Sequence, residues 1–129
     1  MTSPSGLSIE VDHAAHFRTG EDVLSLRPKE RAVIGAIVVH HPEPVAIDEV
    51  IEFVWGDAPP RSARASVHNH LARLRGVAPD LVAATRAGYR IDGDVRVELD
   101  DGVDAHAVRI ALGLSDHPNV RRSCAAFVE

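Results

Sequence analysis

The sequence predicts an α+β fold in which a basic helix is followed at once by a small β-hairpin. Residues 61–76 have helical periodicity, with Ser62 in place to cap the first turn and Gly76 where a left-handed C′ residue is expected. Residues 81–85 form a β-prone run, Ala87 and Gly88 provide a turn, and residues 89–91 return as a second strand. A helix followed by such a hairpin is typical of a winged helix-turn-helix. The hairpin, at 81–92, is then the wing.

A small antiparallel sheet is expected at the N-terminal end, within residues 6–26. Leu7, Ile9 and Val11 alternate with polar residues, and a second apolar run at residues 23–26 follows the turn at 19–22. Alternation of this kind buries one face of a strand.

Two further helices are predicted between this sheet and the basic helix, so that three helices occupy residues 28–76. The first begins at Pro28, which suits a first helical turn, and runs to the stop at Pro42. The second ends at Gly56. Both lack an N-cap side chain, because Arg27 and Ala46 occupy those positions, and each absence costs about 1 kcal/mol. Helical spacing places on the core side Val33, Ala36, Ile37 and His40 of the first helix and Val50, Ile51, Val54 and Trp55 of the second.

The basic helix has one core face and one free face. On a helical wheel the core face carries Ala63, Val67, His70, Leu71 and Leu74, and the opposite face carries Arg61, Ala65, His68, Asn69 and Ala72. Three more arginines, Arg64, Arg73 and Arg75, border the free face. The small alanines at its centre let the helix backbone approach the floor of a groove. Arginine, histidine and asparagine side chains donate hydrogen bonds to base edges and phosphates.

Positive charge is concentrated in this part of the chain. The whole sequence has 14 lysines and arginines against 19 acidic residues, a net charge of −5. Residues 61–90 contain six arginines and one acid, which leaves a charge of +5 there and −10 elsewhere. This distribution favours one surface that binds nucleic acid and argues against a protein that coats it indiscriminately.

The remaining composition narrows the classes of function. The longest apolar run, at residues 32–39, is too short to span a bilayer, and the N-terminal residues do not resemble a signal peptide, so we expect a cytoplasmic protein without a membrane partner. His68 and His70 point about 200° apart on a helix and cannot bind one metal ion. No phosphate-binding glycine loop or catalytic triad context is present. We therefore expect no catalysis, no metal and no cofactor.

The sequence resembles the OmpR-type winged-helix domain, in the version found at the N-terminus of Streptomyces antibiotic regulatory proteins (SARPs). The resemblance covers about three quarters of the chain, and its most specific pieces are VWGDAPPRSAR at residues 54–64, RLR at 73–75 and GYR at 88–90. It implies a transcription factor whose third helix enters the major groove of double-stranded DNA and whose wing touches the minor groove. It also implies head-to-tail homodimers on direct repeats, and a loop of Asp57, Ala58, Pro59 and Pro60 that faces RNA polymerase. The resemblance assigns DNA reading to Arg64, His68, Asn69, Ala72 and Arg73, and phosphate contacts to Arg75, Arg86 and Arg90.

The C-terminal part is expected to differ from the winged helix. Residues 1–103 are predicted as the DNA-binding domain, and residues 104–129 as a helix and tail. Residues 103–114 resemble the start of the helical domain that follows in SARPs. The chain is then expected to be either a stand-alone winged helix or one that carries a remnant of that regulatory domain. The acidic segment 92–104 has two readings: an edge strand or linker, or a segment that folds onto the arginine face and competes with DNA.

Two classes of function remain open. The first is sequence-specific DNA binding that regulates transcription. The second is a winged helix that serves as a protein-interaction module, in which the arginines meet acidic side chains of a partner. An interaction surface usually has an aromatic or aliphatic residue at its centre, and the free face of residues 61–75 has none, so DNA is favoured.

Overall fold

A computed structural model describes residues 6–129 and has the predicted α+β architecture, with a sheet at one end and a β-hairpin at the other. The sheet consists of β1 (Gly6–Val11), β2 (Ala15–Thr19), β3 (Asp22–Leu24) and β6 (Asp94–Leu99), in the order β3-β2-β1-β6. The antiparallel pairing expected within residues 6–26 is confirmed for β1 to β3. The sheet also has a fourth strand, because β6 pairs in parallel with β1.

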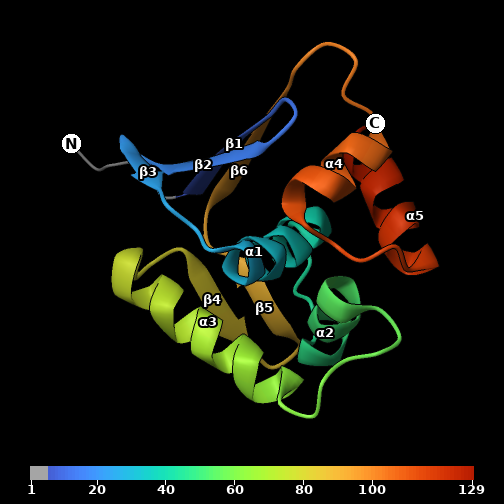
Figure 1. Ribbon diagram of the computed structural model, residues 1–129. Coiled ribbons are helices and arrows are strands. Elements are labelled where there is room, and N and C mark those ends of the chain that lie inside the picture. Colours follow the sequence, from blue (N-terminus) through green and yellow to red (C-terminus); the bar gives the residue numbers. More distant parts are fainter. Residues whose placement is uncertain (1–5) are drawn as a thin grey trace.

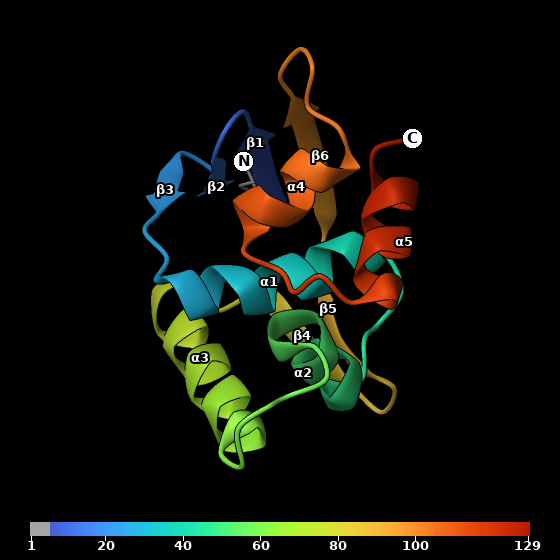
Figure 2. The ribbon, with the colours of Figure 1, turned by 45° about the vertical axis from the view of Figure 1, so that its right-hand side comes forward.

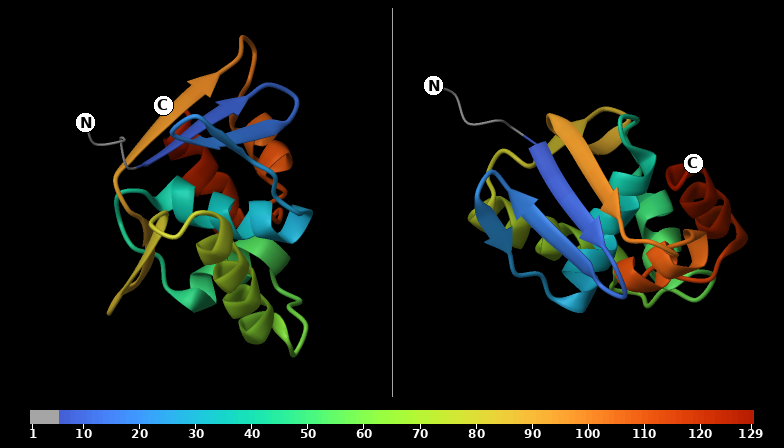
Figure 3. Two further views of the ribbon diagram at one scale, coloured as in Figure 1. Left: turned by 90° about the vertical axis from the view of Figure 1, so that its left-hand side faces the viewer. Right: turned by 90° about the horizontal axis from the view of Figure 1, so that it is seen from above.

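The acidic segment is therefore an edge strand. Figures 1 and 3 show the sheet on the other side of α1 (Pro28–His40) from α3 (Ala63–Val77), so the alternative that this segment covers the arginine face is wrong. The buried side chains of Leu7, Ile9 and Val11 on β1 have the predicted alternation.

Helix α1 is buried on all sides along residues 32–38, whereas the sequence predicted a single core face. Every residue from Ala32 to Val38 is buried, whereas His40 is only partly buried. The helix lies at the centre of the molecule, with α2 (Ile47–Trp55), α3, the hairpin and the C-terminal helices around it (Figure 2). A helix that is apolar all round suits such a position. Its start is also better capped than expected, since the Arg27 N–H donates to Glu30 Oε1 at 3.0 Å.

Helix α2 ends at Gly56 as predicted, with a φ of 71° at that glycine. Val50 and Val54 are buried as expected, Ile51 and Trp55 are partly buried, and Phe53, which the prediction omitted, is also buried.

Helix α3 has the predicted core face: Ala63, Val67, Leu71 and Leu74 are buried and His70 is partly buried. Its ends differ from the prediction. Ser62 holds the N-cap position, but its hydroxyl makes no capping hydrogen bond, and the helix continues through Gly76 to Val77.

The wing consists of β4 (Val82–Thr85) and β5 (Gly88–Ile91), and an isolated bridge from Tyr89 to Val45 extends it. The turn lies at Arg86 and Ala87, one residue earlier than predicted. Gly88 instead begins β5 with a φ of 138°, and a Cβ there would lie 2.1 Å from the Val45 carbonyl oxygen. Only glycine allows this close approach of two backbones.

Two helices, α4 (Ala105–Leu112) and α5 (Pro118–Phe127), follow the sheet, although the sequence predicted a helix only for the first. The Asp104 carboxylate caps α4 by accepting from the Ala107 N–H at 2.9 Å. Both helices share one hydrophobic core with the winged helix and contribute to it Val108, Ala111, Leu112, Val120 and Cys124. None of the helices within residues 6–129 has the length and apolar character needed to cross a membrane.

Candidate nucleic-acid interface

The outward face of α3 is exposed along its whole length. Arg64, His68, Asn69, Ala72 and Arg75 are all exposed, as is Arg61 in the turn before the helix. The same helix turns its apolar residues into the core, so the scaffold fixes which side chains face outward. The result is a basic surface on a rigid element.

A groove of about 320 Å³ lies between α3 and the wing. Arg64 and His68 line it from α3, and Arg86 lines it from the hairpin turn. The Thr85 hydroxyl holds this turn by donating to the Gly88 carbonyl oxygen at 2.9 Å and accepting from the Ala87 N–H at 3.2 Å. Side chains from both expected DNA-contacting elements therefore border one hollow.

Arg64 has a partner in the protein, because its Nη2 lies 3.0 Å from Asp48 Oδ1 at the start of α2. Both side chains are largely exposed, at 58% and 81%. An ion pair in water contributes little energy and is easily exchanged for another partner. Arg64 is thus held near the mouth of the groove without being locked there.

Arg73 is tied more firmly. Its Nε donates to Glu30 Oε2 of α1, and the Glu30 side chain is only 4% exposed. Burial raises the pKa of Glu30, but the hydrogen bonds from the Arg27 N–H and the Arg73 guanidinium, together with nearby positive charge, lower it more, so that this pKa lies below its ordinary 4.5. Glu30 is therefore a buried carboxylate that stays ionised near neutral pH.

Arg90 lies apart from the other arginines. Its strand register places it opposite Ala83, below the hairpin turn that carries Arg86. Its Nη1 lies 3.7 Å from Asp92 Oδ1 and 3.5 Å from the Ile91 carbonyl oxygen, and the side chain is 39% exposed.

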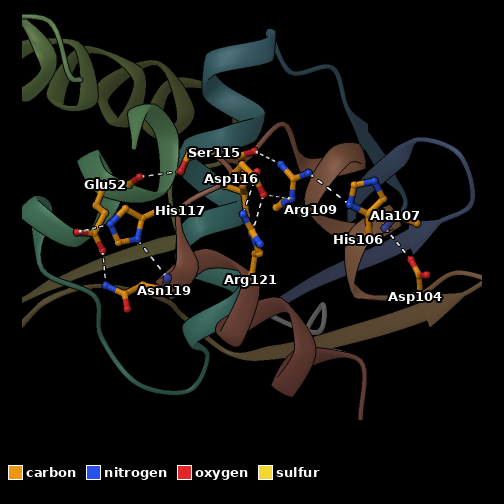
Figure 4. A network of polar contacts seen from close by, with 11 residues as sticks. Glu52, Asp104, His106, Ala107, Arg109, Ser115, Asp116, His117, Asn119 and Arg121 are labelled. Atoms are coloured by element: carbon orange, nitrogen blue, oxygen red, sulfur yellow. Dashed lines mark hydrogen bonds and ion pairs between the residues drawn. The ribbon is translucent and has the colours of Figure 1, made fainter. Parts of the chain in front are cut away.

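The loop of Asp57, Ala58, Pro59 and Pro60 is exposed and connects α2 to α3. The residue before α5 contacts this loop, because His117 Nε2 lies 3.2 Å from Asp57 Oδ1. The same nitrogen lies 3.7 Å from Glu52 Oε2 of α2. Figure 4 shows His117 and Asn119, at the start of α5, beside the Glu52 carboxylate. Asn119 Nδ2 donates to Glu52 Oε1 at 2.7 Å.

Two acidic partners of the α3 arginines, Glu30 and Asp48, were not predicted from the sequence. A signal existed for Glu30, which stands at the third position of a helix that starts with proline, where a glutamate can cap the helix start. The pairing of Glu30 with Arg73 could not be predicted, because the two residues are 43 positions apart and no local spacing pattern connects them.

The described residues show little that would support other chemistry. Within residues 6–129, no group of three or more His, Cys, Asp or Glu side chains is placed to hold a metal ion. Burial raises the pKa of the Cys124 thiol to about 11, so the thiol stays protonated and is a poor nucleophile.

Comparison with known proteins agrees with this geometry. No protein-family model matches the chain. Among curated proteins, the transcriptional regulatory protein EmbR of Mycobacterium tuberculosis is 39% identical over 79 residues, which cover 56% of this chain and 20% of EmbR. The regulatory protein AfsR of Streptomyces coelicolor is 31% identical over 85 residues, which cover 65% of this chain and 9% of AfsR. The structure of M. tuberculosis EmbR in complex with a low-affinity phosphopeptide matches 68% of this chain and 25% of that one, at a TM-score of 0.60 and 27% identity.

The chain is thus similar in sequence to the regulators EmbR and AfsR, and similar in fold to the EmbR structure. These similarities agree with the resemblance to the OmpR-type winged helix of SARPs. The chain spans about a fifth of the length of EmbR, and both EmbR and AfsR are named as regulatory proteins.

Proposed function

We propose that this chain binds double-stranded DNA in a sequence-specific manner and regulates transcription. The observation that carries the proposal is the groove in which Arg64 and His68 of α3 stand beside Arg86 of the wing. In this arrangement α3 enters the major groove and the hairpin turn reaches the adjacent minor groove. The relatives support the regulatory role by their names, and such a role needs neither catalysis nor a cofactor.

Exposure and position divide the roles. Arg64, His68, Asn69 and Ala72 lie on the outward face of α3, where side chains can reach base edges. Arg61 and Arg75 near the ends of that helix, Arg86 on the turn and Arg90 below it are assigned to phosphates, which position a protein without reading sequence.

A single domain of this size reads few base pairs, so useful affinity is expected from two copies arranged head to tail on direct repeats. The exposed loop at residues 57–60 lies away from the groove and is available to RNA polymerase. Residues 1–103 form the DNA-binding part in this proposal, and residues 104–129 begin a helical domain of the kind that follows in SARPs. A purely protein-binding role is disfavoured because the centre of the α3 face, at Ala65, His68, Asn69 and Ala72, offers no aromatic or aliphatic anchor.

Selection of bound duplexes from a random pool tests the proposal and returns the motif. Fluorescence anisotropy with the selected and a scrambled duplex then measures specificity. About four to six phosphate contacts would give a log–log salt slope near −4 to −5, at about −0.9 per contact. Absence of any complex at low ionic strength would refute DNA binding. Equal affinity for both duplexes would refute sequence specificity.

A further inference from the structure

Glu30 is a buried acid in direct contact with the DNA-binding helix. Within residues 6–129 it is the one polar or charged residue in the buried class, at 3% exposure. It stands in the first turn of α1 and reaches the C-terminal half of α3. An isolated buried charge is costly, so its partners explain why it is tolerated.

The carboxylate has a partner on each oxygen. Oε1 accepts from the Arg27 N–H at 3.0 Å, and Oε2 accepts from Arg73 Nε. His70 Nδ1 lies 3.9 Å from the same Oε2 and, although buried, has no hydrogen-bond partner of its own. Glu30 thus joins the start of α1 to two residues of α3.

This contact leaves most of the Arg73 guanidinium free. A guanidinium has five N–H donors in a rigid plane, and Glu30 uses the one on Nε. The side chain is 52% exposed, and helical spacing places it at the edge of the outward face, beside Asn69. The terminal nitrogens are therefore held by a buried anchor at the border of the proposed DNA surface.

We propose that Glu30 is a positioning residue that orients Arg73, through Nε, to present its terminal nitrogens to a backbone phosphate. This inference rests on the proposed DNA binding and reassigns Arg73 from base reading to a phosphate contact. The physical gain is preorganisation: an arginine already fixed in one rotamer loses less conformational entropy when it binds.

One substitution distinguishes positioning from simple electrostatics, because the two predict opposite changes in DNA affinity. Glu30→Gln keeps an acceptor for the Arg27 N–H but removes a negative charge close to the DNA surface. If Arg73 acted only as a charge, this variant would bind DNA more tightly. Positioning predicts the opposite, a loss of about two- to tenfold, because Arg73 is then mobile.

Glu10→Gln is the matched control. It makes the same change in net charge on the exposed surface of β1, in the sheet on the other side of α1 from α3. Anisotropy titrations of both variants, below the thermal transition of each, should show weaker binding only for Glu30→Gln. Binding by Glu30→Gln as tight as wild type would overturn the inference.

Arg73→Ala provides a second readout that a purely structural role would not move. Loss of one phosphate contact makes the log–log salt slope shallower by about 0.9. Adding Glu30→Gln to Arg73→Ala should then cost little further affinity, because the residue that Glu30 orients is already gone. An unchanged slope, or fully additive losses, would contradict the positioning role.

Arg73→Lys covers the case in which Glu30→Gln does not fold. Lysine keeps the charge but cannot join a carboxylate and a phosphate through one rigid plane, so affinity should fall while the protein stays folded. Wild-type affinity in Arg73→Lys would overturn the inference. If the wild type binds no duplex, the proposed function fails; if it binds and these variants match it, only the role of Glu30 fails.

Discussion

Arg64 and Asn69 lie on the exposed face of α3, whereas Arg86 lies on the hairpin turn, and these positions predict different effects of substitution. Arg64→Ala or Asn69→Ala should change which duplex sequence is preferred, since a lost base contact costs about 1–3 kcal/mol at one position only. Arg86→Ala should weaken binding to all duplexes alike and make the salt slope shallower. Titrations against the selected and random duplexes distinguish these patterns. Equal losses on both duplexes for all three variants would contradict the division of roles.

Asp48 places a negative charge next to the same face, 3.0 Å from Arg64. Asp48→Asn should strengthen binding to specific and random duplexes by a few fold, because it removes repulsion from phosphates and frees the arginine. Stability should change by less than about 0.5 kcal/mol, as expected for an exposed pair. Asp101→Asn, an exposed change of equal charge before α4, is the control. Weaker binding by Asp48→Asn would show that Asp48 orients Arg64 instead of repelling DNA.

The lowered pKa of Glu30 makes its contribution to stability depend on pH. A carboxyl whose pKa is lower in the folded chain stabilises the fold above its unfolded pKa, and this stabilisation is lost as pH falls through the folded value. The difference in melting temperature between wild type and Glu30→Gln should therefore be constant near neutral pH and shrink below pH 4.5. Thermal denaturation monitored by circular dichroism measures this. A difference that grows on acidification would contradict the direction of the shift.

At the scale of elements, the sequence predicted whatever depends on local pattern. The periodicity of residues 61–75 was sufficient to place the core and free faces of α3, and the alternation at Leu7, Ile9 and Val11 to place β1. Pairing between distant segments was not accessible: β6 joins β1 in parallel across more than 80 residues of chain. The burial of α1 on all sides could not be predicted either, because it depends on contacts with α4 and α5 from the C-terminal part of the chain.

The close approach of α1 and α4 explains a glycine that would otherwise weaken a helix. A Cβ on Gly35 would lie 3.1 Å from Leu112 Cβ, so the glycine makes room for the leucine. In isolation, Gly35→Ala should stabilise α1 by about 1 kcal/mol. We expect this gain only in a Leu112→Gly background, which removes the Leu112 Cβ with the rest of the side chain and costs at least about 2–5 kcal/mol. A double-mutant cycle by chemical denaturation measures the coupling. Additive effects would mean that the two helices do not constrain one another.

At the scale of the whole molecule, α4 and α5 complete the core of the winged helix. Leu112, Val120 and Cys124 are buried in the same cluster as α1 and α2. Polar contacts strengthen this junction. The Ser115 N–H donates to the Phe53 carbonyl oxygen at 2.7 Å. The Ser115 hydroxyl donates to the Glu52 carbonyl oxygen at 2.9 Å (Figure 4). The winged helix therefore depends on residues beyond its own sheet and hairpin.

A chain ending at residue 103 should be much less stable than the chain of 129 residues. Each large apolar side chain removed from the core forfeits about 1.5–3 kcal/mol, and domains of this size have only about 5–15 kcal/mol in total. We expect a melting temperature lower by more than 10 °C or so, or no cooperative transition, in differential scanning calorimetry. Ile110→Ser, an exposed change on α4 at 56% exposure, should leave the transition unchanged. A shortened chain that melts within about 2 °C of the longer one would show that α4 and α5 only rest on a winged helix that is stable without them.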